Sequence, residues 1–195
     1  MENRRVAILL SGRGSNFVAI YEAIRRGDLN ADICCVISNA ADAAGLARAG
    51  EFGLTAICLP SRGIDRVEYD RTLVKTLRSF EPALVCLAGF MRILTPEFLK
   101  EYPSRVLNIH PALLPSFPGL HAQRQALQYG VKISGCTVHL ADEGVDTGPI
   151  LLQRAVEVLD GDTEESLSAR ILEQEHQIYW RAIALMLDRI NRNTK

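Results

Sequence analysis

The sequence predicts a single α/β domain with a mainly parallel, twisted sheet, flanking helices and an antiparallel hairpin near the C-terminus. Short apolar runs rich in β-branched residues alternate with helical patterns along most of the chain, as in parallel sheets joined by crossover helices. Two further strand-like runs then follow each other with only an acidic loop between them, so we expect them to run antiparallel. A length of 195 residues fits one domain.

The expected strands are apolar runs bounded by glycine, proline or polar residues. They are Val6–Leu10, Ile33–Ile37, Ala56–Leu59, Leu84–Ala88, Val106–Ile109, Ser134–Leu140 and Ile150–Val158. The expected helices have apolar side chains at helical spacing and mostly end near glycine or proline. They are Phe17–Arg26, Ala43–Phe52, Val67–Phe80, Pro96–Glu101, Ala122–Tyr129 and a last helix from Asp162 to about Ile190. Asp162 followed by Glu165 predicts a capping box at the start of that helix.

Composition restricts the classes of partner. A formal net charge of −1 gives no general attraction to nucleic acid or to an anionic membrane surface. The apolar run Val6–Leu10 is too short for the core of a signal peptide, and no other run approaches a membrane span. The five cysteines lie in apolar, strand-like runs without metal-type spacing. We therefore expect reduced, buried thiols in a cytoplasmic protein that binds no metal.

A glycine-rich loop, Ser11–Asn16, follows the first expected strand and opens the first helix. Such a loop brings backbone N–H groups close to an anion, and Ser15 and Asn16 add side-chain donors for phosphate oxygens. It lacks the Gly-Lys-Ser/Thr of a Walker loop, and Phe17 stands where a dinucleotide fingerprint needs its third glycine. The pattern favours a monophosphate, and the alternative is a tight turn with a capping side chain.

Asn108 and His110 lie two residues apart at the end of an expected strand that Pro111 terminates. Alternation places both side chains on one face, at the sheet edge where α/β proteins bind ligands. Asp146, in the acidic loop, would hold the histidine protonated and oriented if it lies beside it, as acid catalysis on a carbonyl requires. The alternative is a capped turn with a buried, hydrogen-bonded histidine.

The segment Leu87–Leu94 reaches the same edge, and its apolar side chains would line a flat slot or be ordinary core residues. Glu175 lies on the core-facing stripe of the last helix, where a carboxylate needs a partner. His139 fits a hydrogen-bonded core histidine better than a ligand, and His176 fits a surface position.

Taken together, Ser11–Asn16, Leu87–Leu94, Asn108–Gly119 and Gly135–Leu140 running into Asp146–Pro149 resemble the phosphoribosylglycinamide formyltransferase family of purine biosynthesis. The match covers nearly the whole chain. It implies a Rossmann-like formyltransferase fold with a nucleotide-phosphate half, about 1–100, and a catalytic and folate half, about 101–195. Two related families, methionyl-tRNA formyltransferase and formyltetrahydrofolate deformylase, share the Asn, His, Asp set but carry additional domains, so the length favours the first family.

The resemblance also implies site residues. Asn108, His110 and Asp146 would be catalytic, Gly14, Ser15 and Asn16 would hold the ribonucleotide phosphate, and Glu175 would contact the ribose. The folate-binding residues would be Arg66, Met91, Arg92, Ile93, Leu94, Asn108, Leu140, Ala141, Asp142, Glu143, Gly144 and Val145. Leu172 departs from the family, in which a basic residue often precedes the glutamate by three positions.

The implied reaction transfers the formyl group of 10-formyltetrahydrofolate to the amine of 5'-phosphoribosylglycinamide, without a metal. Asn108 and protonated His110 would stabilise the charged oxygen, and Asp146 would raise the histidine pKa and relay a proton. We expect small-molecule substrates and a monomer or homodimer. A hydrolase that releases formate, and a non-catalytic sugar-phosphate-binding module, are the alternative functions.

Overall fold

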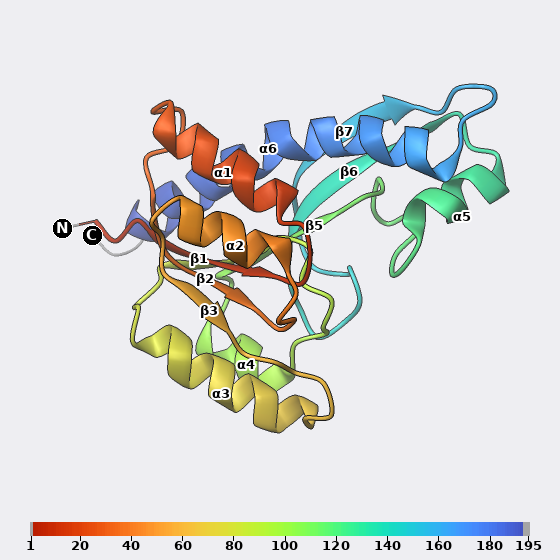
Figure 1. Ribbon diagram of the computed structural model, residues 1–195. Coiled ribbons are helices and arrows are strands. Elements are labelled where there is room, and N and C mark those ends of the chain that lie inside the picture. Colours follow the sequence, from red (N-terminus) through yellow and green to blue (C-terminus); the bar gives the residue numbers. More distant parts are fainter. Residues whose placement is uncertain (1, 193–195) are drawn as a thin grey trace.

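The computed structural model describes residues 2–192, and all structural statements refer to these residues. One sheet of seven strands has the order β3-β2-β1-β4-β5-β6-β7 (Figure 1). The strands are β1 Arg5–Leu10, β2 Asp32–Ser38, β3 Ala56–Cys58, β4 Leu84–Leu87, β5 Val106–His110, β6 Ile133–Leu140 and β7 Ile150–Glu157. The helices are α1 Ser15–Arg25, α2 Ala44–Glu51, α3 Arg66–Arg78, α4 Pro96–Glu101, α5 Ala122–Tyr129 and α6 Glu164–Arg192.

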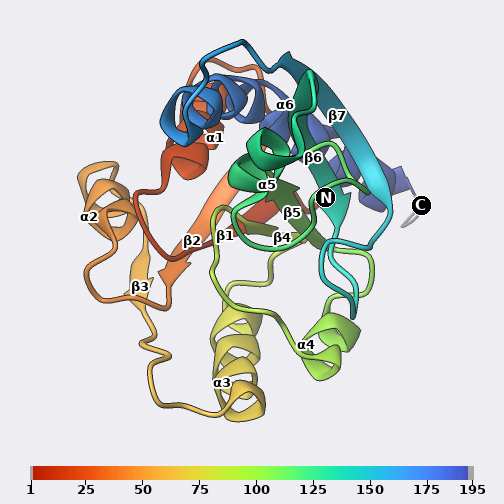
Figure 2. The ribbon, with the colours of Figure 1, turned by 90° about the vertical axis from the view of Figure 1, so that its right-hand side faces the viewer.

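The sheet changes from parallel to antiparallel pairing at β5. Strands β1 to β5 pair in parallel, whereas β5 with β6 and β6 with β7 pair antiparallel. This confirms the predicted mixed sheet and its C-terminal hairpin. The order reverses direction between β1 and β4, so loops from neighbouring strands diverge to opposite faces and leave a crevice at their C-terminal ends. That edge faces the viewer in Figure 2.

Helices cover both faces of the sheet and create two separate cores. On one face α1, α2 and α6 pack on alternate strand residues such as Ile8 and Ile109. On the other face α3 and α4 cover the intervening residues, such as Leu9 and Val106 (Figure 1). Because Asn108 shares the parity of Val106, its side chain points to the α3 and α4 face.

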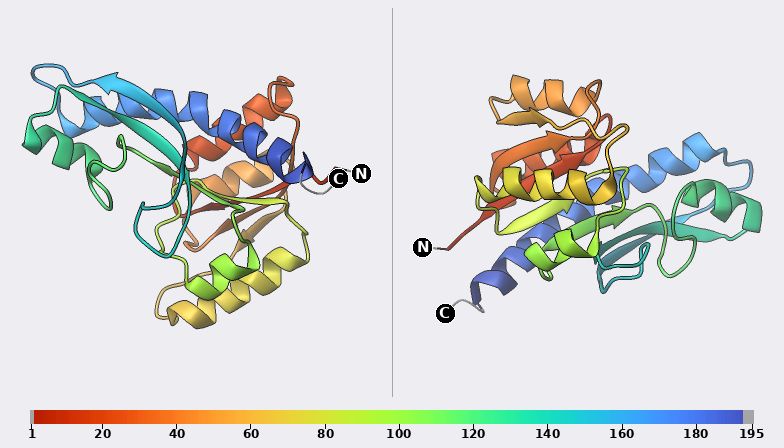
Figure 3. Two further views of the ribbon diagram at one scale, coloured as in Figure 1. Left: turned by 180° about the vertical axis from the view of Figure 1, so that it is seen from behind. Right: turned by 90° about the horizontal axis from the view of Figure 1, so that it is seen from below.

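The two ends of the described chain lie side by side, as Figure 3 shows from two directions. The Asn3 N–H donates to Asn191 Oδ1 at 3.1 Å, and Asn191 Nδ2 returns a hydrogen bond to the Asn3 carbonyl at 3.2 Å. These bonds attach the end of α6 to the chain that enters β1. No helix within residues 2–192 is both long and apolar enough to cross a membrane.

Two local predictions were wrong. The capping box of α6 lies one residue later than expected: Thr163 and Ser166 exchange backbone-to-hydroxyl hydrogen bonds at 3.0 and 3.2 Å. The Asp162 carboxylate instead pairs with Arg170 at 2.8 Å and accepts a 2.7 Å hydrogen bond from the Ser166 hydroxyl, so it does not cap a backbone N–H of the first turn. Cys58 is exposed, in contrast to the other four cysteines, because β3 is the edge strand of the parallel region.

Candidate active site

Strands β5 and β6 bring the polar side chains of Asn108, His110 and His139 together. Asn108 lies directly opposite His139, and His110 lies opposite Thr137, in the antiparallel register of these strands. Directly opposed residues in such a pair project to the same face of the sheet. Asn108 Nδ2 accordingly lies 3.1 Å from His139 Nε2. Pairing between strands therefore adds a second histidine to the pair predicted from the sequence.

Asp146 connects these groups from the loop after β6. Its Oδ2 lies 3.2 Å from His110 Nδ1 and accepts a 2.8 Å hydrogen bond from the Gly119 N–H. Its Oδ1 accepts from Asn108 Nδ2 at 3.2 Å and lies 3.5 Å from His139 Nε2. The backbone of Asp146 has a φ of 55°, which is uncommon for residues other than glycine. The predicted proximity of Asp146, Asn108 and His110 is thus present in the fold.

The protonation of His110 is set by opposing influences. Burial lowers the pKa of His110, while the Phe117 carbonyl and the Asp146 carboxylate act in the opposite direction. For Asp146, burial raises the pKa, but the neighbouring His139, the hydrogen bond from the Gly119 N–H and the charge of His110 bring it below its ordinary value. The carboxylate therefore favours the charged histidine as expected, although the net pKa of His110 is lowered. A carboxylate and the Phe117 carbonyl, 2.8 Å from Nε2, face the two ring nitrogens.

The amide of Asn108 is fully engaged in this arrangement. His139 Nδ1 lies 2.9 Å from the Leu140 carbonyl, which can only accept, so Nε2 is the acceptor of the neutral ring and the two Asn108 hydrogens go to Asp146 Oδ1 and His139 Nε2. The carboxylate fixes which end of the amide faces it, because a carboxylate accepts hydrogen bonds and does not donate them. Donation from Asn108 to a substrate oxygen requires one of these contacts to be released.

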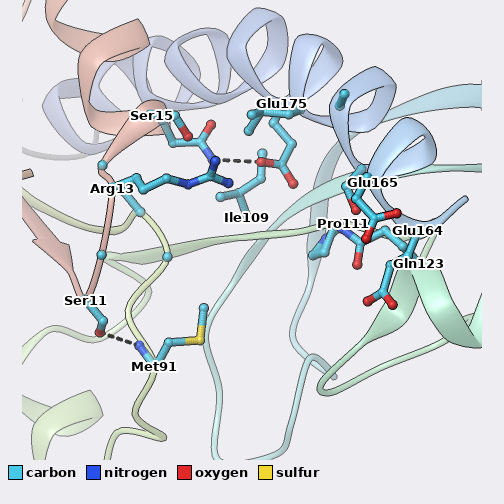
Figure 4. Close-up of a pocket in the computed structure, with 18 residues that line it drawn as sticks. Ser11, Arg13, Ser15, Met91, Ile109, Pro111, Gln123, Glu164, Glu165 and Glu175 are labelled. Atoms are coloured by element: carbon cyan, nitrogen blue, oxygen red, sulfur yellow. Dashed lines mark hydrogen bonds between the residues drawn. The ribbon is translucent and has the colours of Figure 1, made fainter. Parts of the chain in front are cut away.

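A cavity of about 740 Å³ opens beside this group, between the loop after β1, the end of β5 and helix α6 (Figure 4). Ile109 and Pro111, which flank His110, line it together with Ser11–Asn16 and Glu175. Gly14 has φ of 73°, and a Cβ built on it would lie 2.9 Å from the Cα of Gly45. Only glycine fits this close approach of the loop to α2.

Glu175 receives the partner that its buried position requires. Its Oε2 accepts a 2.7 Å hydrogen bond from Asn16 Nδ2, drawn as a dashed line in Figure 4. Burial raises the pKa of Glu175 to about 7, although the Asn16 amide opposes that change. The structure thus joins the glycine-rich loop to the last helix within one cavity, as the proposed ribonucleotide contacts require.

The residues predicted to bind folate lie on several loops at the same sheet edge. Met91 and Ile93 are exposed, whereas Leu94 is buried in the core beneath α3. The Arg92 guanidinium lies 4.5 Å above the ring of Tyr69. Arg66 is exposed at the start of α3. In the other loop, Leu140 is buried and Ala141 is half-buried, while residues 142–145 are exposed.

The sequence assigned no role of its own to Arg13, and it correctly predicted His139 as a buried, hydrogen-bonded histidine without placing it beside Asn108. Arg13 is the only arginine or lysine among the residues that line the cavity, which also include Glu164, Glu165 and Glu175. The side chain extends over the cavity in Figure 4. Position within the glycine-rich loop was an available signal for Arg13, whereas His139 depends on strand register, which the sequence does not specify. His176, expected on the surface, is half-buried, and burial lowers its pKa.

Leu172 also lines the cavity, so the departure from the family pattern lies in the cavity wall. Residues from both halves of the chain, such as Arg13 and Leu172, line the cavity. Among residues 2–192, no group of three or more histidine, cysteine, aspartate or glutamate side chains is arranged to hold a metal ion.

Residues 4–183 match the family model described as Formyl transferase. Phosphoribosylglycinamide formyltransferase of Escherichia coli is 44% identical over 184 residues, which are 94% of this chain and 87% of that protein. Trifunctional purine biosynthetic protein adenosine-3 of Drosophila melanogaster is 46% identical, but the match covers only 14% of its length. Glycinamide ribonucleotide transformylase 1 from Symbiobacterium toebii superposes with a TM-score of 0.93 at 48% identity, covering 96% of this chain and 89% of that structure. The chain belongs to the formyl transferase family.

Proposed function

We propose that the protein transfers the formyl group of 10-formyltetrahydrofolate to the amine of 5'-phosphoribosylglycinamide; the name of the E. coli relative indicates formyl transfer to phosphoribosylglycinamide for that enzyme. The observation that carries the proposal is the cavity that is lined by Ser11–Asn16, by Glu175 and by Ile109 and Pro111, the residues flanking His110. A ribonucleotide monophosphate matches this cavity in its parts: a glycine-rich loop for the phosphate and a carboxylate for the ribose, with a carbonyl-activating group adjacent to the cavity.

In this reaction the substrate amine attacks the formyl carbon, the bond from that carbon to the folate nitrogen breaks, and an amine proton passes to the folate nitrogen. We assign Asn108 and His110 to the formyl oxygen, whose negative charge grows during attack. Asp146 orients His110 and favours its charged form. Because Asn108 is engaged with His139 and Asp146, and His110 Nε2 with the Phe117 carbonyl, substrate binding must displace one contact of each.

For the folate we infer contacts with Arg66, Met91, Arg92, Ile93 and Leu94, with Asn108, and with the loop 140–145. The exposed side chains of Met91, Ile93 and Val145 support this, since they offer apolar surface at the sheet edge beside Asp146. We propose Gly14, Ser15 and Asn16 as the phosphate contacts and Glu175 as the ribose contact.

A spectroscopic assay of a formylfolate, run with and without 5'-phosphoribosylglycinamide, tests the proposal. We expect tetrahydrofolate to form only when the ribonucleotide is present, with formylated ribonucleotide in equal amount. Release of formate without the acceptor would favour the hydrolase. Ribonucleotide binding that persists with no turnover, and that is indifferent to substitution of His110, would favour a binding module.

The proposed substrates are small molecules, and the net charge of −1 supports neither nucleic acid nor a membrane surface as a partner. We propose that the protein acts in the cytoplasm as a monomer or homodimer. We also infer one catalytic domain, in which residues of about 1–100 supply most phosphate contacts and residues of about 101–195 the catalytic groups.

A further inference from the structure

A ring of hydrogen bonds, most of them made by side chains, lies at the C-terminal ends of the parallel strands. Ser11 Oγ donates to Asn39 Oδ1 at 2.5 Å, and Asn39 Nδ2 donates to Ser61 Oγ at 3.0 Å. The Met91 N–H donates to Ser11 Oγ at 2.7 Å, and Arg92 Nη1 donates to the Ser61 carbonyl at 3.3 Å. The series starts at Met91 and ends at Arg92, which are adjacent in sequence, so the bonds close on themselves. We name these five residues the strand-end ring.

The strand-end ring ties together four neighbouring strands. Ser61 follows β3, Asn39 follows β2, Ser11 follows β1, and Met91 with Arg92 follows β4, in the spatial order of the sheet. Backbone bonds support the same links: the Ser11 N–H donates to the Gly89 carbonyl at 3.0 Å, and the Ser61 N–H to the Asn39 carbonyl at 3.1 Å. Asn39 is the central member, since its amide joins two hydroxyl groups on opposite sides.

Within this ring the main chain of Met91 is held while its side chain is free. The Met91 side chain is 69% exposed, although its N–H is bonded to Ser11. A fixed backbone with open apolar side chains suits a loop that binds a flat apolar ligand, because less conformational freedom is lost on binding. Ser11 also lines the cavity and Asn39 does not, so Asn39 can act on a ligand only through Ser11 or Ser61.

We propose that Asn39 is a positioning residue for the formyl donor: it orients the Ser11 hydroxyl to accept the Met91 N–H, and so fixes the loop Gly89–Leu94. The donor's identity rests on the proposed function. Without the Asn39 amide, the Ser11 hydroxyl rotates freely and the Met91 N–H loses its acceptor for part of the time. The groups near the reacting carbonyl, Asn108 and His110, have no bond to the ring.

The kinetic test compares Asn39→Ala with Ser38→Ala in the full chain. The hydroxyl of Ser38, the preceding residue, bonds to the backbone carbonyl and N–H of Ala40 at 3.0 and 3.1 Å, so Ser38→Ala serves as a matched loss of local side-chain hydrogen bonds. Asn39→Ala should raise KM for 10-formyltetrahydrofolate about three- to tenfold, the effect of one lost hydrogen bond. Turnover at saturation and KM for the ribonucleotide should stay within about twofold of wild type, because the glycine-rich loop keeps the hydrogen bond from Asn16 to Glu175. Ser38→Ala should leave all three constants within about twofold.

An unchanged donor KM in Asn39→Ala, or an equal rise in Ser38→Ala, would overturn the proposal. If the wild-type protein transfers no formyl group in this assay, the proposed function fails instead, and a second measurement still tests the strand-end ring.

That measurement is hydrogen exchange at the Met91 amide. Loss of the acceptor should speed exchange about fivefold or more in Asn39→Ala, because protection follows the free energy of local opening. Ser38→Ala should keep wild-type protection. Asn39→Asp should keep it too, since its two oxygens accept from the hydroxyls of Ser11 and Ser61. Wild-type protection in Asn39→Ala, or its loss in Asn39→Asp, would contradict the assigned role.

Discussion

Glu175 is a buried carboxylate whose hydrogen-bond partner is the Asn16 amide. Replacing this carboxylate by an uncharged amide should make the protein more stable than wild type at alkaline pH. The side chain is 6% exposed, and its hydrogen bond comes from Asn16 at 2.7 Å. Burial raises the pKa of Glu175 from its ordinary value of 4.5 to about 7, against the effect of Asn16. Glu175→Gln keeps the shape and an oxygen for Asn16 but has no charge to bury.

The magnitude follows from that pKa. Between pH 4.5 and about 7 the folded protein binds more protons at this site than the unfolded chain, so wild-type stability falls as pH rises through this window. One pKa unit corresponds to about 1.4 kcal/mol, so above pH 7 the charge on Glu175 lowers the free energy of unfolding by about 3 kcal/mol. The cost is absent below pH 4.5. Glu175→Gln should therefore match wild type near pH 4.5 and exceed it by about 3 kcal/mol at pH 8.

Thermal melting at pH 4.5 and pH 8 measures the effect, since other titrating groups cancel between variant and wild type. For a chain of this size, about 3 kcal/mol raises Tm by about 6–12 °C. Glu173→Gln, on the exposed side of the same helix, is the control and should show no such pH dependence. A Glu175→Gln advantage equal at both pH values would refute the reasoning. The same variant should weaken ribonucleotide binding if Glu175 contacts the ribose.

Three further substitutions test other parts of the site and fold. Asp146→Asn should lower kcat by at least about 100-fold while calorimetry shows near-normal ribonucleotide affinity, and a near-normal kcat would remove Asp146 from the mechanism. Arg13→Met should raise KM for the ribonucleotide about tenfold, because a charge-assisted contact with the phosphate is lost. The control Arg25→Met, at the far end of α1, should leave this KM unchanged. Equal effects of the two substitutions would argue against a phosphate contact by Arg13. Thr163→Ala should lower the free energy of unfolding by about 1 kcal/mol in urea titration, and no change would show that the cap is energetically neutral.

The fold follows closely from local patterns in this chain. Alternation of apolar strands and amphipathic helices predicted every element, because each crossover unit buries a continuous apolar run that the sequence displays directly. Errors arose where competing side chains decide a boundary. At the start of α6, Asp162 matches a capping pattern as well as Thr163 does. Arg170, eight residues further along the chain, binds the Asp162 carboxylate, and Thr163 is the capping residue.

The site was predictable to the extent that it depends on position along one strand. Asn108, His110 and the Ser11–Asn16 loop stand at strand ends, which the sequence marks with proline and glycine. His139 and Asn39 are different, since neither carries a motif. Their roles depend on which strands are neighbours: His139 faces Asn108 through the β5–β6 register, and Asn39 lies between the ends of β1 and β3.

The switch from parallel to antiparallel pairing at β5 explains how His139 and Asp146 come to lie beside Asn108 and His110. A parallel neighbour would end at the same edge as β5 and lead away into a helix, whereas β6 runs back past β5 and lays His139 against Asn108. The loop that leaves β6 then returns Asp146 to the end of β5, where it meets His110 at 3.2 Å. On the other side of β5, the chain runs from β1 to α1 on one face of the sheet and from β4 to α4 on the opposite face, and the cavity lies at this edge. The proposed carbonyl-activating group and the proposed nucleotide cavity are thus adjacent because one strand, β5, borders both kinds of pairing.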